Sequence, residues 1–330
     1  MREAILKNIL VLKRTVTSYK IQFLFLAKII ISVGLFWYLV SVIEPNEIIS
    51  AVINANIYLI GLSLSLVILN IYLQYLKWKI TCSSLLGEES KRKIMLSLLY
   101  GFSAGAFTPV RIGEYFGRAL VLKDKSFLQV TTATLVDKFF TLVILAFFGS
   151  ITSILFIHFY YKTTFYITLS LFIVVFTLFY LLILFIRNPE FFNNLILKKL
   201  NESRRLSKLF NKLKILTNLN RNYSLKMISL STFFYSCYII QYAFLVSAFS
   251  GNYNFMDYLW AGNLVMFAKT LIPPVSLSDI GIREGASVFF LDKFGESASV
   301  AFNASVFLFL INVLLPAVLG LIFLFKKNND

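Results

Sequence analysis

The sequence predicts an all-α polytopic membrane protein with about six spanning helices and two re-entrant helical hairpins inserted from opposite sides. Three observations predict this fold class. Hydrophobic residues make up 58% of the chain, and its mean hydropathy is +0.77. Apolar runs of about 20 residues, the length that crosses a bilayer, recur along it. The basic residues gather on alternate connecting segments, as they do in proteins with a fixed orientation in a membrane.

The apolar runs predict spans at about residues 21–43, 57–76, 127–157, 164–186, 226–249 and 299–325. Basic residues outside the apolar stretches fall almost entirely on segments 1–20, 77–93, 118–125, 187–226 and 326–327, whereas the opposite side holds Lys162 and Lys293. This asymmetry predicts a multi-pass protein of the cell (inner, cytoplasmic) membrane with both termini in the cytoplasm. No polar stretch is long enough for a soluble domain, so residues 1–330 are expected to form one membrane domain.

The formal net charge of +16 is explained by this orientation. Residues 1–20 form a cytoplasmic basic arm, and residues 187–225 form a second cytoplasmic basic segment with amphipathic helical spacing over 191–219. We expect the second segment to lie on anionic lipid; a partner-binding helix is the alternative. The basic balance therefore predicts membrane lipids, with anionic headgroups, as partners and no nucleic acid.

Two apolar stretches are too short in each arm to span. Residues 94–123 are expected to enter from the cytoplasm and turn at Thr108-Pro109, and residues 257–293 to enter from outside and turn near Pro273–Asp279. Together with their flanking spans they form two units of opposite sidedness, which is an inverted-repeat-like design found in transporters. The alternative is that these proline-interrupted segments pack as kinked helices.

Charged pairs follow both breaks, Arg111 with Glu114 and Arg283 with Glu284. A charge at membrane depth costs about 2.5–3.5 kcal/mol, so such residues are retained mainly for function. The residues expected to form the breaks and cap the following helices are Thr108, Pro109, Gly113, Pro273, Pro274, Ser276, Ser278, Asp279 and Gly281. Thr108 is the expected N-cap, with Pro109 at the first helical position. Both helix N-termini would then point toward the midplane.

Two arginines beside two positive helix ends predict a receptor for phosphate, because guanidinium groups bind phosphate oxygens in a bidentate fork. We expect Arg111 to pair with Glu284 across the hairpins, and Arg283 with Glu114. A static ion-pair network that holds the hairpins together is the alternative.

Three more charged residues lie within apolar stretches and are candidate substrate contacts. Asp137-Lys138 is expected to line the same cavity, with self-neutralised packing as the alternative. Lys269 could attract an anionic headgroup or extend to the membrane edge. His158 is the only histidine, so no metal site is predicted from it, and no cofactor is predicted.

These motifs resemble a known family of flippase-like membrane proteins, namely the transmembrane region of lysylphosphatidylglycerol synthases and its stand-alone relatives. The resemblance rests on Thr108-Pro109-x-Arg111-Ile112-Gly113-Glu114, on Arg118, on Asp137-Lys138, and on Pro274 through Gly285. Val110 stands where the family often has glycine, and Ser278-Asp279 stand where a glycine pair is common. The resemblance implies lipid translocation between leaflets rather than headgroup synthesis, with phospholipids or polyprenyl-phosphate-linked glycans as substrates.

The predicted function is therefore a lipid flippase-like transporter that moves a phosphate-bearing lipid through a polar cavity at the midplane. Two alternatives remain open. One is a membrane-embedded glycosyl or lipid transferase, for which Glu44 and Glu47 would have to supply the base. The other is a non-catalytic partner subunit of a lipid or glycan synthase. The possible protein partners are a synthase or further copies of the same chain in a homo-oligomer.

Overall fold

The computed structural model describes residues 30, 34, 37–41, 43–106, 108, 111–187, 220–272 and 281–327. These residues form helices and turns, without a β-strand among them. Five of the described helical segments are long and apolar enough to cross a membrane: Ile57–Leu86, Phe127–Tyr161, Phe165–Leu184, Arg221–Ser250 and Ala298–Phe323. They confirm five of the six predicted spans. The first predicted span lies mostly outside the described residues, as do the arm 1–20 and the amphipathic stretch 191–219.

The elements in chain order are α2 (Pro45–Ile53), α3 (Ile57–Thr81), the π-helix η1 (Cys82–Leu86), α4 (Lys91–Ala106), α5 (Gly113–Val121), α6 (Phe127–Tyr161), α7 (Phe165–Arg187), α11 (Arg221–Ser250), α12 (Phe255–Leu271), α13 (Ile282–Lys293), α14 (Ala298–Phe309), the π-helix η6 (Leu310–Leu314) and α15 (Leu315–Lys327). Side-chain caps explain several starts. Asn56, Ser126, Asn220 and Ser297 each accept a backbone N–H in the first turn of α3, α6, α11 and α14.

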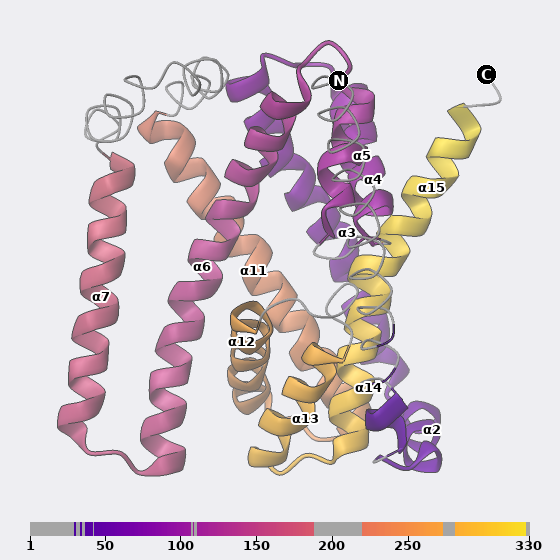
Figure 1. The fold of residues 1–330 in the computed structure, drawn as a ribbon. Helices are drawn as coiled ribbons and strands as arrows, with labels where there is room; N and C mark the ends of the chain where they lie inside the picture. Colours follow the sequence, from indigo (N-terminus) through magenta and orange to yellow (C-terminus); the bar gives the residue numbers. More distant parts are fainter. Residues whose placement is uncertain are drawn as a thin grey trace, which may run out of the picture.

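Two short helical hairpins lie at opposite ends of the long helices (Figure 1). The hairpin of α4 and α5 packs at the end where α6 begins, and the hairpin of α12 and α13 at the end where α6 finishes. Their arms are 16, 9, 17 and 12 residues long, shorter than the roughly 20 residues of a spanning helix. The helix boundaries lie within a few residues of the predicted arms; the largest difference is at α5, which begins at Gly113, whereas Pro109 was the predicted first helical position.

Glycines allow α4 and α5 to pack at very short range. Gly113 and Gly117, one turn apart on α5, face the backbone of Ala104 and Tyr100 on α4, where a Cβ atom would clash with the carbonyl oxygens. On α4, a Cβ at Gly101 would lie 2.9 Å from Cγ of Arg118. Paired small residues four apart are a common means of close helix packing in membranes.

The hydrophobic core divides into two main clusters, one beside each hairpin. Trp78, Leu98 and their neighbours form the first among α3, α4, α5 and α6, and Tyr242, Val265 and their neighbours form the second among α11 to α14. A layer of buried amides joins α3, α11 and η6: the Nδ2 group of Asn70 donates to Gln241 Oε1 and, at 3.1 Å, to Asn312 Oδ1. A polar contact thus links the two halves at a π-helical interruption of the last long helix.

The end of the molecule at which α4 begins is also tied together by charge. Lys93 Nζ lies 2.8 Å from Asp124 Oδ2, in the turn between α5 and α6. The hydrogen bond from Lys93 lowers the pKa of the Asp124 carboxyl, and the same bond raises the pKa of Lys93. Both groups are exposed, so this contact adds little stability. It does mark the surface of the end that carries most of the described basic residues.

Candidate functional site

The start of α5 places Arg111 beside a buried carboxylate. Thr108 Oγ1 accepts a hydrogen bond of 2.7 Å from the Gly113 amide and donates to the Ala104 carbonyl at 3.0 Å, so it joins the two arms of the hairpin. Arg111 has φ of +54°, a left-handed conformation that is uncommon for any residue other than glycine. The predicted N-cap was wrong: the helix begins five residues after Thr108, and Arg111 precedes it instead of lying in its first turn.

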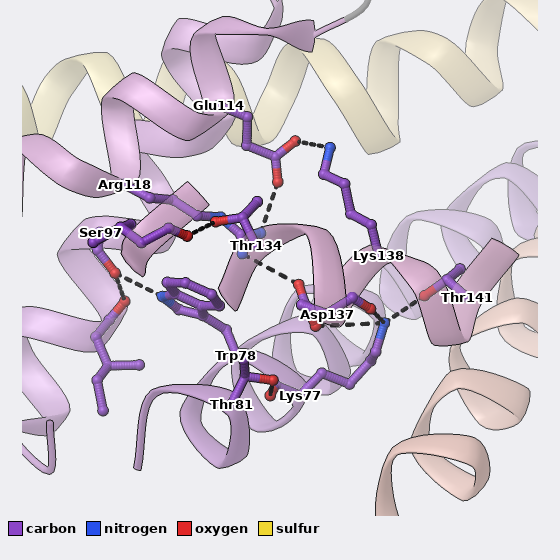
Figure 2. A network of polar contacts seen from close by, with 12 residues as sticks. Lys77, Trp78, Thr81, Ser97, Glu114, Arg118, Thr134, Asp137, Lys138 and Thr141 are labelled. Carbon is purple, nitrogen blue, oxygen red and sulfur yellow. Dashed lines mark hydrogen bonds and ion pairs between the residues drawn. The ribbon is translucent and has the colours of Figure 1, made fainter. Parts of the chain in front are cut away.

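Glu114 is the centre of the first polar cluster, which we define as Lys77, Arg111, Glu114, Arg118, Asp137 and Lys138. Figure 2 labels all of these residues except Arg111. Its Oε2 atom lies 2.6 Å from Lys138 Nζ and 3.9 Å from Arg111 Nε, and its Oε1 atom lies 2.7 Å from Arg118 Nη2. The carboxylate is 3% exposed. A buried carboxylate stays ionised only with such partners, and three cations approach this one.

Asp137 is the second carboxylate of this cluster, and Arg118 bridges it to Glu114. Arg118 Nη1 lies 3.2 Å from Asp137 Oδ2, and Lys77 Nζ lies 3.7 Å from Asp137 Oδ1. The Arg118 guanidinium also stacks 4.1 Å from the ring centre of Trp78, whose Nε1 group donates to Ser97 at 2.7 Å. Arg118 is therefore held rigidly from three sides.

The first polar cluster contains more positive than negative charge. Four cations meet two carboxylates, an excess of two positive charges among the described residues. Lys77 and Arg118 are buried, with side chains 4% and 2% exposed, whereas the side chains of Arg111 and Lys138 are 34% and 29% exposed. The accessible positive charge thus lies at Arg111 and Lys138.

The second polar cluster consists of Arg283, Glu284 and Ser305, at the start of α13. Arg283 donates to Glu284 Oε1 through Nη2 and to Ser305 Oγ through Nε, the latter at 2.9 Å. Glu284 Oε2 accepts the Gly281 amide at 2.7 Å, which caps α13. Both charged residues are 1% exposed, and their charges cancel. Among the described residues, this cluster is therefore closed and neutral.

A comparison with known protein families supports the fold and the motifs together. Residues 25–320 match the family described as the lysylphosphatidylglycerol synthase TM region. The chain belongs to this family. No curated protein and no solved structure matches the chain. Membership confirms the resemblance drawn from the motifs, and with the five apolar helices it identifies a multi-pass membrane protein of a lipid-related family.

In this member of the synthase TM region family, the predicted ion pairs across the hairpins are wrong. Glu114 pairs with Arg118, Lys138 and Arg111 of its own cluster, and Glu284 pairs with its neighbour Arg283. Each carboxylate pairs with a cation of its own hairpin or of the helix packed beside it, because such a residue reaches the carboxylate without any movement of the backbone. The expectation that Asp137-Lys138 and the Arg111 motif lie together agrees with the geometry.

The remaining predicted positions are distributed as follows. Lys269 lies near the end of α12, half-buried. Gly281, with φ of +89°, adopts the left-handed conformation that glycine allows and precedes α13. Pro109, Pro273, Pro274, Ser276, Ser278 and Asp279 lie outside the described residues. That the candidate residues bind substrate stays a prediction.

Two residues of the first polar cluster, Lys77 and Arg118, were not predicted as site residues from the sequence. Lys77 and Arg118 were both counted with the cytoplasmic basic segments, and Arg118 was otherwise named for the family resemblance. Two signals could have found Arg118: it follows Glu114 by one turn, and the pairs Gly101/Gly105 and Gly113/Gly117 indicate a tightly packed hairpin around that turn. Lys77 carried no comparable signal.

Proposed function

We propose that this protein is a flippase-like transporter that moves a phosphate-bearing lipid between leaflets, and that Arg111 and Lys138 receive the headgroup. The excess of positive charge in the first polar cluster carries the proposal. Uncompensated charge at membrane depth is costly, and an anionic ligand removes that cost. Membership of a lipid-related family supports a lipid as the source of the anion.

The geometry around Glu114 supports an exchange of partners. Lys138 and Arg111 approach the same oxygen, Oε2, from two sides, while Arg118 holds the other oxygen. A phosphate that approaches the two exposed cations replaces Glu114 as their partner, and Glu114 keeps Arg118. The cluster then needs no large rearrangement, because Arg118 stays fixed by Trp78 and Asp137. Weak internal pairing of Arg111 suits a group that must bind and release.

We further propose that the two hairpins are re-entrant, that they enter from opposite faces as an inverted repeat, and that both termini are cytoplasmic. Their short arms and their positions at opposite ends of α6 support this arrangement (Figure 1). The described basic residues at the α4 end, including Lys91, Lys123 and Lys326, support a cytoplasmic location for that end.

The transport proposal is tested with purified protein in vesicles that contain an acyl-labelled fluorescent phosphatidic acid, by following loss of the label to a membrane-impermeant quencher. Arg111→Gln and Lys138→Met should each lower the transfer rate at least about tenfold, since each removes a charge-assisted contact with phosphate. Lys93→Ala, an exposed lysine outside the cluster, is the matched control and should transfer at the rate of the unmodified protein.

Unchanged transfer in both cluster variants would refute the receptor. Chromatography of the lipids from the same vesicles separates the alternatives: transfer without a new product supports a transporter, and a new lipid product supports a transferase.

Topology is tested by single cysteines in a background without Cys82 and Cys237, both of which are buried. A cysteine at Lys123, in the α5–α6 turn, should react with an impermeant reagent from the cytoplasmic side alone. One at Asp292, near the end of α13, should react from the outside alone. Reaction of both from the same side would refute opposed hairpins.

A further inference from the structure

The first polar cluster also contains information about the charge of its ligand. Glu114 is shared by three cations and Asp137 by two, with Arg118 counted in both sets. Neither carboxylate therefore has capacity to neutralise another cation. Arg111 Nε is buried without a hydrogen-bond partner, at 3.9 Å from the nearest carboxylate oxygen. Two positive charges remain for a ligand among the described residues.

The position of these charges restricts the ligand further. Arg111 and Lys138 approach one oxygen of Glu114, so both can reach oxygens of a single phosphate group. The neighbouring α5 N-terminus adds positive potential on the same side, since Arg111 lies two residues before the first residue of the helix, Gly113. The left-handed backbone at Arg111 holds the guanidinium in this place although the conformation is strained. Such strain is typical of residues placed for a ligand.

On these grounds, and resting on the proposed function, we infer that the preferred substrate is a lipid that ends in a phosphate monoester, with close to two negative charges. A phosphate monoester neutralises both excess charges near neutral pH. A phosphodiester headgroup leaves one of them uncompensated. A choline or aminoacylated headgroup also brings its own cation beside Lys138, which like-charge repulsion disfavours.

The inference is tested by binding of four soluble probes to the full chain in uncharged detergent. The probes are dihexanoyl phosphatidic acid, dihexanoyl phosphatidylglycerol, dihexanoyl phosphatidylcholine and inorganic phosphate, measured by titration calorimetry. Phosphatidic acid should bind about tenfold or more tightly than phosphatidylglycerol, because one more charge-assisted contact forms. Phosphatidylcholine should bind most weakly of the three lipids.

Arg111→Gln is the decisive variant, because its side chain is the most exposed in the cluster and it removes one of the two excess charges. The preference for phosphatidic acid over phosphatidylglycerol should fall to within about threefold. Lys93→Ala should keep the full preference. Circular dichroism and a thermal melt of each variant show that it is folded.

Equal affinity of the unmodified protein for phosphatidic acid and phosphatidylglycerol would overturn the inference. Equal affinity for inorganic phosphate and phosphatidic acid would show that the site recognises free phosphate, and this would overturn the inference that the ligand is a lipid. The vesicle assay separates failure of this inference from failure of the transport proposal. Transfer of phosphatidic acid and phosphatidylglycerol at the same rate would refute the preference for a monoester and would still support transport. Strong preference in binding without transfer supports the class and refutes the transporter.

Discussion

The two polar clusters start from nearly the same residues and arrive at opposite arrangements. Each follows the break of a short hairpin, and each contains an arginine and a glutamate within four residues. Arg283 and Glu284 neutralise each other, are 1% exposed, and are closed off by Ser305 and the Gly281 amide. In the first polar cluster the carboxylates are outnumbered, and Arg111 and Lys138 remain partly exposed.

This difference teaches that the same motif can serve packing at one end and recognition at the other. A neutral, saturated pair has no capacity for a ligand and can hold α13 against α14. An unbalanced cluster has a desolvation cost for its uncompensated charge, and a bound anionic ligand removes that cost. We therefore propose that the second polar cluster is an anchor. The sequence-based prediction that Arg283 and Glu284 bind substrate is the competing hypothesis.

The largest expected effect comes from breaking the anchor one side at a time. Arg283→Met leaves Glu284 buried without its cation, and this should lower the free energy of unfolding by about 3–5 kcal/mol. Adding Glu284→Gln should recover most of that loss, because the amide can still accept the Gly281 N–H and no charge is left unpaired. Denaturation in mixed micelles, followed by circular dichroism, measures both variants.

The vesicle assay on the double variant decides between the two hypotheses. An anchor predicts transfer near the rate of the unmodified protein once stability is recovered. A stable double variant that no longer transfers lipid would show that Arg283 contributes to recognition, and the contrast between the clusters would fail.

A second prediction compares the glycines of the two hairpins. Gly117→Ala should lower the free energy of unfolding by about 1–3 kcal/mol, because the new Cβ meets the Tyr100 carbonyl and lies 2.9 Å from the Gly101 nitrogen. Gly285→Ala on α13 is the matched control: nothing lies within 4 Å of its Cβ, and alanine favours the helix by about 0.8–1 kcal/mol. The same micelle denaturation measures both.

Equal effects of these two substitutions would contradict the close packing of α4 on α5. A large loss of lipid transfer in Gly117→Ala is expected as well, since Glu114 and Arg118 project from the same helix over Gly101. Gly285→Ala should leave transfer unchanged if α13 is only anchored.

The two polar clusters also differ in how much of each could be predicted from the sequence. Apolar length predicted the long helices, and the proline and charge patterns placed the hairpin arms within a few residues. Grouping Arg111, Glu114 and Asp137-Lys138 followed from the rarity of charge at membrane depth. Which cation pairs with which carboxylate did not follow, because that depends on the distance between helices that only tertiary packing fixes.

Lys77 illustrates the same limit. The predicted span before the first hairpin ended at residue 76, because about 20 apolar residues are enough to cross a bilayer. Lys77 was therefore counted with the cytoplasmic basic residues. The observed α3 continues to Thr81 and then into η1, which carries Lys77 inside the bundle to Asp137. A length rule gives the shortest helix that crosses a bilayer and says nothing of how far a helix extends beyond it.

The smallest expected effect concerns the contact between the two halves. Asn70 on α3 donates a hydrogen bond of 3.1 Å to Asn312 in η6. Asn312 precedes Pro316 by four residues, and the N–H group that proline lacks accompanies the π-helical turn. Asn70→Leu, Asn312→Leu and the double variant form a cycle, and the coupling free energy should be about 0.6 kcal/mol, the usual size for such bonds in membranes. Asn303→Leu, paired with the Ile48 carbonyl instead, is the control and should show no coupling with Asn70. Coupling near zero between Asn70 and Asn312 would contradict a stabilising role for this bond, and the buried bonds between α3 and α11, such as the one from Gln241 to the Ser63 carbonyl, would then be the polar contacts that join the halves.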